Sequence, residues 1–219
     1  MKVGILGGTF DPIHAGHLYL ARHVLRMQTL DQVLLLIARR PPHKRQRSLA
    51  GPYHRFAMAA LATQDDNLLR PCSWELKRPA PSYTIDALRH FRSRHPAWRL
   101  TFIAGSDSLR DLHSWRDYAK LLEEFSFTFV QRPGETVDLT TLKLPAPLRE
   151  RITVADASMP LDIRPGASLL ICLDAPDVSS TRLRQTLSSG GIPENGAVPD
   201  PVLRYARKFG LYETSQDDH

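Results

Sequence analysis

Short apolar runs alternate along the chain with amphipathic stretches, the pattern of strands followed by helices. The first run, residues 2–6 (KVGIL), is continuous and ends in Gly7-Gly8, which predicts a buried strand that closes in a turn. In residues 17–27 the apolar positions recur on one helical face. A second continuous run follows over residues 32–38 (QVLLLIA). This unit predicts two parallel strands joined by a right-handed crossover.

The same alternation continues toward the C-terminus. We expect further strands over residues 68–76, 100–104, 125–130 and 169–173, and helices over residues 52–63, 84–94, 115–123, 180–187 and 201–209. Residues 133–165 are rich in loop signals and predict no definite element. Strands that alternate with helices predict an α/β protein with an open, mainly parallel sheet and helices on both faces. Ligands of such sheets bind beyond the carboxyl ends of the strands, so chemistry is expected in residues 7–17, 39–47, 105–118 and 176–184.

Composition places the chain among ordinary globular proteins. It has 219 residues, of which 42% are hydrophobic and 24% charged, and this excludes collagen, general disorder and a disulfide-rich miniprotein. Two cysteines, Cys72 and Cys172, cannot form a disulfide framework, and no run approaches the ~18 apolar residues of a membrane span. We therefore expect a cytoplasmic protein. The net charge of +6 suits either a nucleic acid or a small molecule with several phosphates, although general solubility explains it equally well.

The segment that leaves the first strand carries the most informative motif. Residues 7–17 read GGTFDPIHAGH. Paired glycines let backbone N–H groups approach a phosphate, and a following helix N-terminus adds positive potential. Two imidazoles three residues apart can donate hydrogen bonds to phosphate oxygens. The same residues could instead form a tight turn with two core histidines, or a metal pair that lacks a third ligand nearby; the pattern is neither a Walker loop nor a dinucleotide fingerprint.

Two other strand exits carry polar clusters. Residues 177–184 read DVSSTRLR, in which Ser179 or Ser180 suits a helix N-cap and the hydroxyls together with Arg184 suit an oxyanion. Residues 39–47 read RRPPHKRQR, which is either a solvated basic loop or a grip for a phosphate. The pattern alone leaves both alternatives open at each exit.

Taken together, these residues resemble a known superfamily. A strand followed by GGTFDPIHAGHL, with a distant SSTRLR, is similar to the nucleotidyltransferases that carry an H-x-G-H motif. The resemblance narrows to the bacterial nicotinate-nucleotide adenylyltransferases through PPHK (41–44), PSYT (81–84), GSDS (105–108), Trp115 and the closing GLY (210–212). It covers nearly the whole chain in order. It implies a Rossmann-like fold, one domain over residues 1–219 and a small closing helical appendage over residues 183–212.

The resemblance also implies an activity and a set of site residues. The expected reaction transfers AMP from ATP to nicotinate mononucleotide, giving deamido-NAD and pyrophosphate in NAD biosynthesis, with Mg²⁺ bound through the ATP phosphates and no metal ligand in the chain. His14 and His17 are expected to stabilise charge on the α-phosphoryl group. The residues expected to bind ATP are Gly7, Gly8, Thr9, Phe10, Gly105, Asp107, Ser179, Ser180, Thr181 and Arg184. Those expected to bind the mononucleotide are Lys44, Arg45, Tyr83, Thr84 and Trp115.

Other interpretations remain beside this one. Asp107 could cap a helix, and Trp115 could belong to the core. A related enzyme, such as pantetheine-phosphate adenylyltransferase, would need a hydrophobic pantetheine groove and has no use for Trp115 and PSYT. A basic nucleic-acid-binding module built on residues 39–47 would show a steep salt dependence, but leaves the two phosphate motifs unexplained. We therefore expect ATP and nicotinate mononucleotide as partners, and neither nucleic acid nor membrane.

Overall fold

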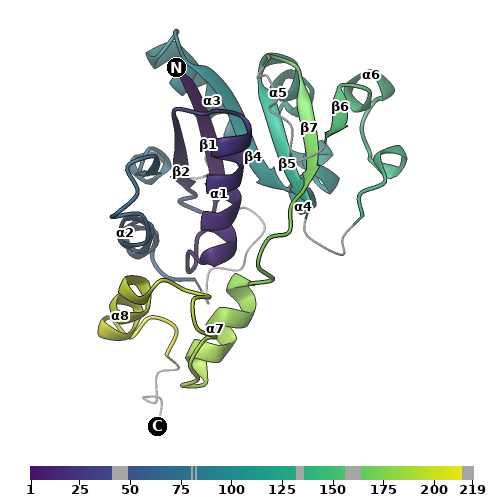
Figure 1. Cartoon of the computed structure of the whole chain (residues 1–219). Coiled ribbons are helices and arrows are strands. Elements are labelled where there is room, and N and C mark those ends of the chain that lie inside the picture. Colours follow the sequence, from purple (N-terminus) through teal and green to yellow (C-terminus); the bar gives the residue numbers. More distant parts are fainter. Residues whose placement is uncertain (41–48, 80, 82, 132–135, 156–163, 214–219) are drawn as a thin grey trace.

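A seven-stranded sheet forms the centre of the protein (Figure 1). The structure is a computed structural model that describes residues 1–40, 49–79, 81, 83–131, 136–155 and 164–213. The strands are β1 (Lys2–Gly8), β2 (Gln32–Ile37), β3 (Leu69–Cys72), β4 (Arg99–Gly105), β5 (Ser126–Gln131), β6 (Ile152–Ala155) and β7 (Ser168–Cys172). Their order is β3-β2-β1-β4-β5-β7-β6, and each pair of neighbours runs parallel. The expected open, mainly parallel α/β sheet is confirmed.

The strand order reverses between β1 and β4, which lie side by side with Leu6 opposite Ile103. From β1 the chain builds outward through β2 and β3, then returns to the centre and builds the other half from β4. Loops that leave β1 and β4 therefore turn away from each other, and this divergence opens the usual ligand position of a doubly wound sheet. Gly8 and Gly105 end the two strands at this point.

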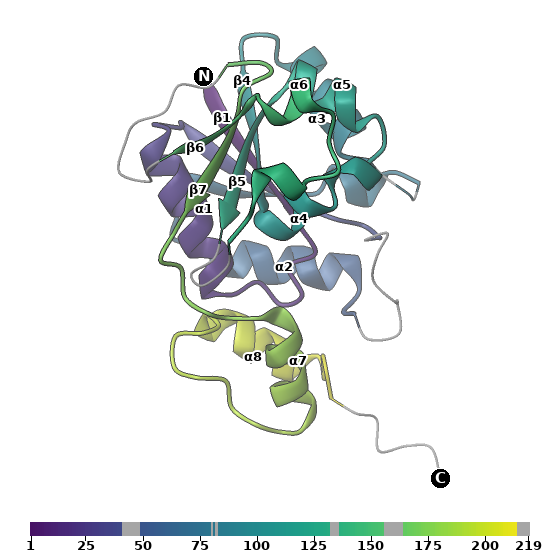
Figure 2. The ribbon, with the colours of Figure 1, turned by 90° about the vertical axis from the view of Figure 1, so that its right-hand side faces the viewer.

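Helices cover both faces of the sheet. They are α1 (Ala15–Met27), α2 (Pro52–Ala62), α3 (Thr84–Arg94), α4 (Ser106–Arg110), α5 (Tyr118–Glu124), α6 (Ala146–Arg149), α7 (Ser180–Ser188) and α8 (Asp200–Lys208). On one face α1 and α2 pack on side chains such as Leu35 and Ile103, and on the other α3 and α5 pack on Phe102 and Phe127. Figure 2 shows α7 and α8 beyond the carboxyl ends of the strands, where they form the expected C-terminal appendage. Among the described residues, no helix is both long and apolar enough to cross a bilayer.

Two sequence expectations need correction, and one stretch that was left unassigned contains regular structure. The strand predicted over 68–76 ends at Cys72, because the chain then forms a 3₁₀ turn over Glu75–Lys77. The helix predicted from Trp115 begins at Tyr118, since Asp117 takes a left-handed backbone with a φ of 51°. The stretch without a definite prediction contains α6 and β6, and β6 is a four-residue edge strand without a buried apolar run, which is why hydrophobic pattern did not reveal it.

Candidate active site

The loop from β1 to α1 brings two histidine rings together. His14 precedes α1 with an extended backbone and is 4% exposed, and its ring centroid lies 3.7 Å from that of His17. A Cβ on Gly16 would lie only 3.2 Å from the His14 ring, so glycine at this position leaves room for the close approach of the two rings. Both imidazoles therefore sit at the amino end of α1, where the helix dipole favours an anion.

The ring of Phe10 fixes the preceding turn. Phe10 is 1% exposed and takes a left-handed backbone with a φ of 51°. Its ring lies over Gly8, where a Cβ would come within 2.8 Å of the Phe10 Cζ atom. The glycine at the end of β1 thus leaves room for an aromatic side chain that turns the loop toward the histidines.

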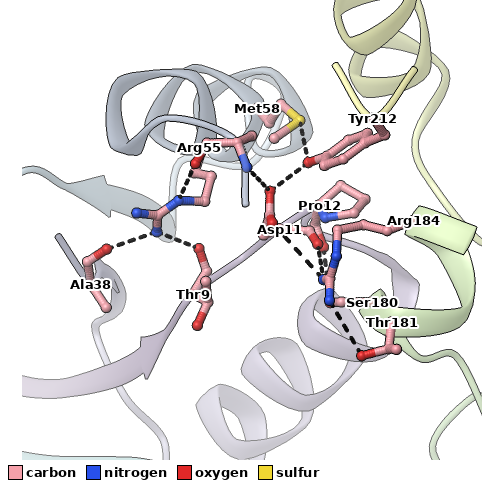
Figure 3. Close-up of polar contacts among 11 residues, drawn as sticks. Thr9, Asp11, Pro12, Ala38, Arg55, Met58, Ser180, Thr181, Arg184 and Tyr212 are labelled. Carbon is pink, nitrogen blue, oxygen red and sulfur yellow. Dashed lines mark hydrogen bonds and ion pairs between the residues drawn. The ribbon is translucent and has the colours of Figure 1, made fainter. Parts of the chain in front are cut away.

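The amino end of α7 packs against this loop, as Figure 3 shows. The Ser180 hydroxyl donates to the Pro12 carbonyl at 3.3 Å, and the Arg184 Nη1 atom donates to the Asp11 carbonyl at 2.7 Å. Arg184 also donates through Nη2 to the exposed Thr181 hydroxyl at 3.4 Å, while Ser179 precedes the helix without capping it through its side chain. The two motifs are separated by more than 160 residues in sequence and form one unit in the fold.

A buried carboxylate lies at the centre of this junction. Asp11 is 1% exposed, and its Oδ1 atom accepts hydrogen bonds from the Tyr212 hydroxyl at 2.6 Å and from the Ala50 N–H at 3.2 Å (Figure 3). Arg184 Nη1 lies 3.9 Å from the Asp11 Oδ2 atom. Burial raises the pKa of Asp11, and the Tyr212 hydroxyl and Arg184 oppose that rise. Burial and the charge of Asp11 raise the pKa of Tyr212, so this phenol stays a donor.

Beside the junction is a cavity of about 290 Å³. Its walls come from the ends of β1, β2 and β4, from the turn before α3 and from the segment around Trp115. The Trp115 ring meets Phe102 edge to face with centroids 5.9 Å apart, and the Arg116 guanidinium lies 4.7 Å from the centre of the Tyr83 ring. The lining is mostly aromatic and aliphatic and includes Gly7, Gly8, Thr9, Ala38, Tyr83, Thr84, Phe102 and Trp115.

Most of the site residues expected from the sequence come together here. Gly7, Gly8, Thr9, Tyr83, Thr84 and Trp115 line the cavity, and His14, His17, Ser180 and Arg184 form the neighbouring junction. Gly105 precedes α4 and takes its N-cap position, whereas Asp107 lies in the first turn with its side chain exposed. A Cβ on Gly105 would collide with the Asp107 carboxylate, which folds back over it. Lys44 and Arg45 lie outside the described residues.

Arg55 and Glu75 are among the residues of the site that the sequence interpretation missed. Arg55 is 1% exposed and donates four hydrogen bonds to loop carbonyls. Glu75, from the 3₁₀ turn, is 8% exposed and reaches the cavity. An arginine on an amphipathic helix normally indicates the solvated face. The one sign that Arg55 is buried was its spacing of three and four residues from Met58 and Ala59, which are both buried. Within the described parts of the chain, no group of three His, Cys, Asp or Glu side chains is arranged to hold a metal ion.

Comparisons with known proteins agree with this architecture. The cytidylyltransferase-like family model matches residues 5–186. A probable nicotinate-nucleotide adenylyltransferase of Symbiobacterium thermophilum is 37% identical over 211 residues, covering 96% of this chain and 95% of that protein. Another, of a Roseiflexus species, is 38% identical over 213 residues, covering 96% and 97%.

A solved structure shows the same fold. The nicotinic acid mononucleotide adenylyltransferase of Plasmodium falciparum, complexed with NaAD, superposes with a TM-score of 0.73 at 21% identity, covering 96% of this chain and 97% of that one. The likeness in structure concerns the fold, while the family model and the full-length relatives identify the family. The chain belongs to the cytidylyltransferase-like family and, within it, to the nicotinate-nucleotide adenylyltransferases.

Proposed function

We propose that this chain transfers the adenylyl group of ATP to nicotinate mononucleotide, forming deamido-NAD and releasing pyrophosphate. The names of the full-length relatives support this activity. The observation that carries it is the position of the closely packed His14–His17 pair. The pair lies at a helix N-terminus, in the loop that α7 contacts and that also contributes Thr9 to the aromatic cavity. One nucleotide can therefore lie against the two motifs, residues 7–17 and 177–184, which we call the motif side. The other nucleotide can lie in the cavity.

The chemistry asks little covalent work of the protein. A phosphate oxygen of the mononucleotide forms a bond to the α-phosphorus of ATP, while the bond from that phosphorus to the pyrophosphate oxygen breaks. The attacking phosphate is already an anion, so no general base is required. The protein contributes position and charge stabilisation, which is the usual division of labour in phosphoryl transfer.

We assign the motif side to ATP. His14 and His17 donate hydrogen bonds to the phosphates and stabilise the charge that develops around the α-phosphorus. The backbone of Gly7, Gly8, Thr9 and Phe10 approaches the same group. The amino end of α7, with Ser179, Ser180, Thr181 and Arg184, holds the β- and γ-phosphates. Gly105 and Asp107 follow β4, and the exposed Asp107 carboxylate accepts from the ribose hydroxyls.

We assign the cavity to the pyridine mononucleotide. Its lining matches an aromatic ring, and Trp115 offers an indole for stacking. Thr84 begins α3 and Tyr83 precedes it, so the positive amino end of this helix meets the ring carboxylate. Lys44 and Arg45, which lie outside the described residues, bind the mononucleotide phosphate. Arg40, from the end of the described segment before them, lines the cavity.

Magnesium enters this site with ATP. The residues around the histidines supply imidazoles, hydroxyls and N–H groups, and the carboxylate of the same loop, Asp11, is buried and hydrogen-bonded. This donor set fits an ion held by phosphate oxygens and water, the usual coordination of Mg²⁺ by nucleotides, better than an ion held by the chain. When bound, the ion neutralises charge on the triphosphate.

One assay tests the proposal. Pyrophosphate release is measured with ATP and Mg²⁺ against nicotinate mononucleotide, nicotinamide mononucleotide and phosphopantetheine. We expect the highest kcat/KM with nicotinate mononucleotide. Preferred turnover of phosphopantetheine would indicate the related pantetheine enzyme. Absence of any release, together with salt-sensitive binding of DNA or RNA, would favour the nucleic-acid module instead.

A further inference from the structure

Arg55 is an unusual residue for a helix that faces the core. It lies in α2, is 1% exposed, and uses four of its five N–H donors on backbone carbonyls. Its Nε atom donates to Ala50 at 3.0 Å, and Nη2 donates to Arg39 at 3.1 Å. Its Nη1 atom donates to both Thr9, at 2.8 Å, and Ala38, at 2.7 Å (Figure 3). One guanidinium therefore joins the loop after β1 to both ends of the connection between β2 and α2.

The two carbonyls that share Nη1 lie where β1 and β2 part. The ladder between these strands ends with Gly8 opposite Ile37 and one further bond, from the Ala38 N–H to the Gly8 carbonyl at 2.9 Å. Beyond that bond the strands diverge, and Arg55 supplies the next connection between them. Thr9 and Ala38 both line the 290 Å³ cavity, so Arg55 lies behind one of its walls.

The neighbours of Arg55 explain why a charge can remain buried there. Burial lowers the pKa of Arg55, and the negative charge of Asp11 opposes that effect. Asp11 accepts from the Ala50 N–H while Arg55 donates to the Ala50 carbonyl, so the acid and the base hold the same peptide segment. A lysine would keep the charge but lose the planar fork that reaches several carbonyls at once.

We propose that Arg55 is a positioning residue for adenylyl transfer: it fixes the loops after β1 and β2 as one wall of the mononucleotide cavity. This inference rests on the proposed function. It predicts that a change of Arg55 raises the KM for nicotinate mononucleotide more than the KM for ATP. The ATP side is held by Ser180 and Arg184 through the Pro12 and Asp11 carbonyls. Three of the four hydrogen bonds of Arg55 hold Ala38, Arg39 and Ala50, outside the ATP motifs, and the fourth holds Thr9, where the two sides meet.

The decisive experiment compares steady-state kinetics of the wild type, Arg55→Lys and Arg22→Lys. Arg22 is the matched control, because its half-exposed side chain makes one surface ion pair with Asp66, at 2.9 Å, away from the site. For Arg55→Lys we expect the KM for nicotinate mononucleotide to rise at least about tenfold and kcat/KM to fall about 10²-fold, the scale of a displacement near 1 Å. The KM for ATP should stay within about threefold. Arg22→Lys should match the wild type.

A second variant covers the case in which Arg55→Lys does not fold, as judged by circular dichroism and thermal melting. Tyr212→Phe removes only the hydroxyl that donates to Asp11, and so loosens the Asp11–Ala50 contact on which Arg55 depends. It should raise the KM for the mononucleotide about threefold and the KM for ATP by less, because Arg184 still holds the Asp11 carbonyl on the ATP side.

Several outcomes would overturn the inference. They are a folded Arg55→Lys with wild-type KM values, equal rises in both KM values, or, if only Tyr212→Phe folds, wild-type kinetics in that variant. An inactive wild type would instead refute the proposed function, so the two failures can be told apart.

Discussion

The two sides of the active site are built in different ways. On the side that we assign to ATP, polar residues from two motifs lie at helix N-termini, and each is itself a donor or acceptor. On the side that we assign to the mononucleotide, the surface is a cavity with aromatic walls, and a buried arginine holds one of these walls from behind. Charge on phosphates is met by individual groups, which appear in the sequence as motifs. Recognition of a ring depends on packing, which involves many residues that have no motif.

The most severe test of the motif side is His17→Ala. We expect kcat to fall by about two orders of magnitude or more, the scale for loss of one charge-stabilising donor, with the fold retained. His17 belongs to the first turn of α1, and the centroid of its ring lies 3.7 Å from that of His14. The measurement is kcat for pyrophosphate release at saturating substrates.

A control for this variant exists on the same helix. His23→Ala removes an imidazole from α1 at a position far from its amino end, where the ring lies 5.8 Å from that of Tyr19. It should keep nearly wild-type kcat. A folded His17→Ala with kcat close to that of the wild type would remove this histidine from the chemistry and with it the contrast between the two sides.

Choice between the acid and the amide tests the cavity side. Nicotinate presents two acceptor oxygens to the N–H groups at the start of α3, whereas nicotinamide places an NH₂ against donors. A mismatched polar group in a closed pocket costs roughly 1–3 kcal/mol, so kcat/KM should favour the acid by about tenfold to several-hundredfold. Both mononucleotides are compared at one Mg²⁺ concentration and one pH.

The buried Glu75 sharpens this test. It is the only acidic side chain among the described residues that line the cavity, and so the group most able to accept from an amide NH₂. Glu75→Gln removes a negative charge near the ring and should increase the preference for the acid. A wild-type ratio near one would mean that the start of α3 does not recognise the carboxylate.

The fold was largely predictable from the sequence because its strands are unusually clear. Continuous apolar runs such as QVLLLIA, bounded by glycines and charged residues, indicate buried parallel strands and place the strand exits. Residues 152–155 escaped because an edge strand needs no apolar run when one face is open, and Val154 is 67% exposed. The start of α5 was misplaced because the left-handed backbone of Asp117 depends on packing that no local pattern indicates.

The residues of the site also fall into those that the sequence revealed and those that it did not. Histidines, glycines and hydroxyls at strand exits were visible because topology alone places them at one edge of the sheet. Arg55 was not visible, because its role depends on which carbonyls remain unpaired after β1 and β2 diverge. Tyr212 likewise meets Asp11 across 201 positions of sequence, and only the packing of the C-terminal segment brings them together.

Trp115→Ala measures how much of the cavity side comes from stacking. Removal of a stacking partner typically costs about 1–3 kcal/mol per base, so the KM for the mononucleotide should rise by about tenfold, with less change in the KM for ATP. Trp98→Ala is the control, since Trp98 stacks on His95 with centroids 3.8 Å apart and lies outside the cavity lining. Equal effects on both KM values would indicate that Trp115 only supports the core.

Tyr212→Phe is expected to have the smallest effect on activity, and it probes the connection between the two sides. Its effect is measured as the stability of the fold at different pH values. Four groups face the Asp11 carboxylate: the Tyr212 hydroxyl, the Ala50 N–H, and the guanidinium groups of Arg184 and Arg55. The folded pKa of Asp11 lies above its unfolded value, so the folded state binds the proton more tightly. Stability therefore falls as pH rises from the unfolded value, about 3.9, through the folded one.

Loss of the Tyr212 hydroxyl removes a bond that lowers the pKa of Asp11, so the folded pKa rises further and the fall in stability extends to higher pH. The difference in unfolding free energy between wild type and variant should thus be smallest in acid and grow with pH. At neutral pH it should reach about 2 kcal/mol, the scale for a hydrogen bond to a charged group, or roughly 4–8 °C in Tm. Melting curves from pH 4 to 8 measure it, with the exposed Tyr53→Phe as control. A difference that does not change with pH would mean that Tyr212 acts through its contact with Met58 rather than through the carboxylate, and that the charge at the junction does not depend on the C-terminal segment.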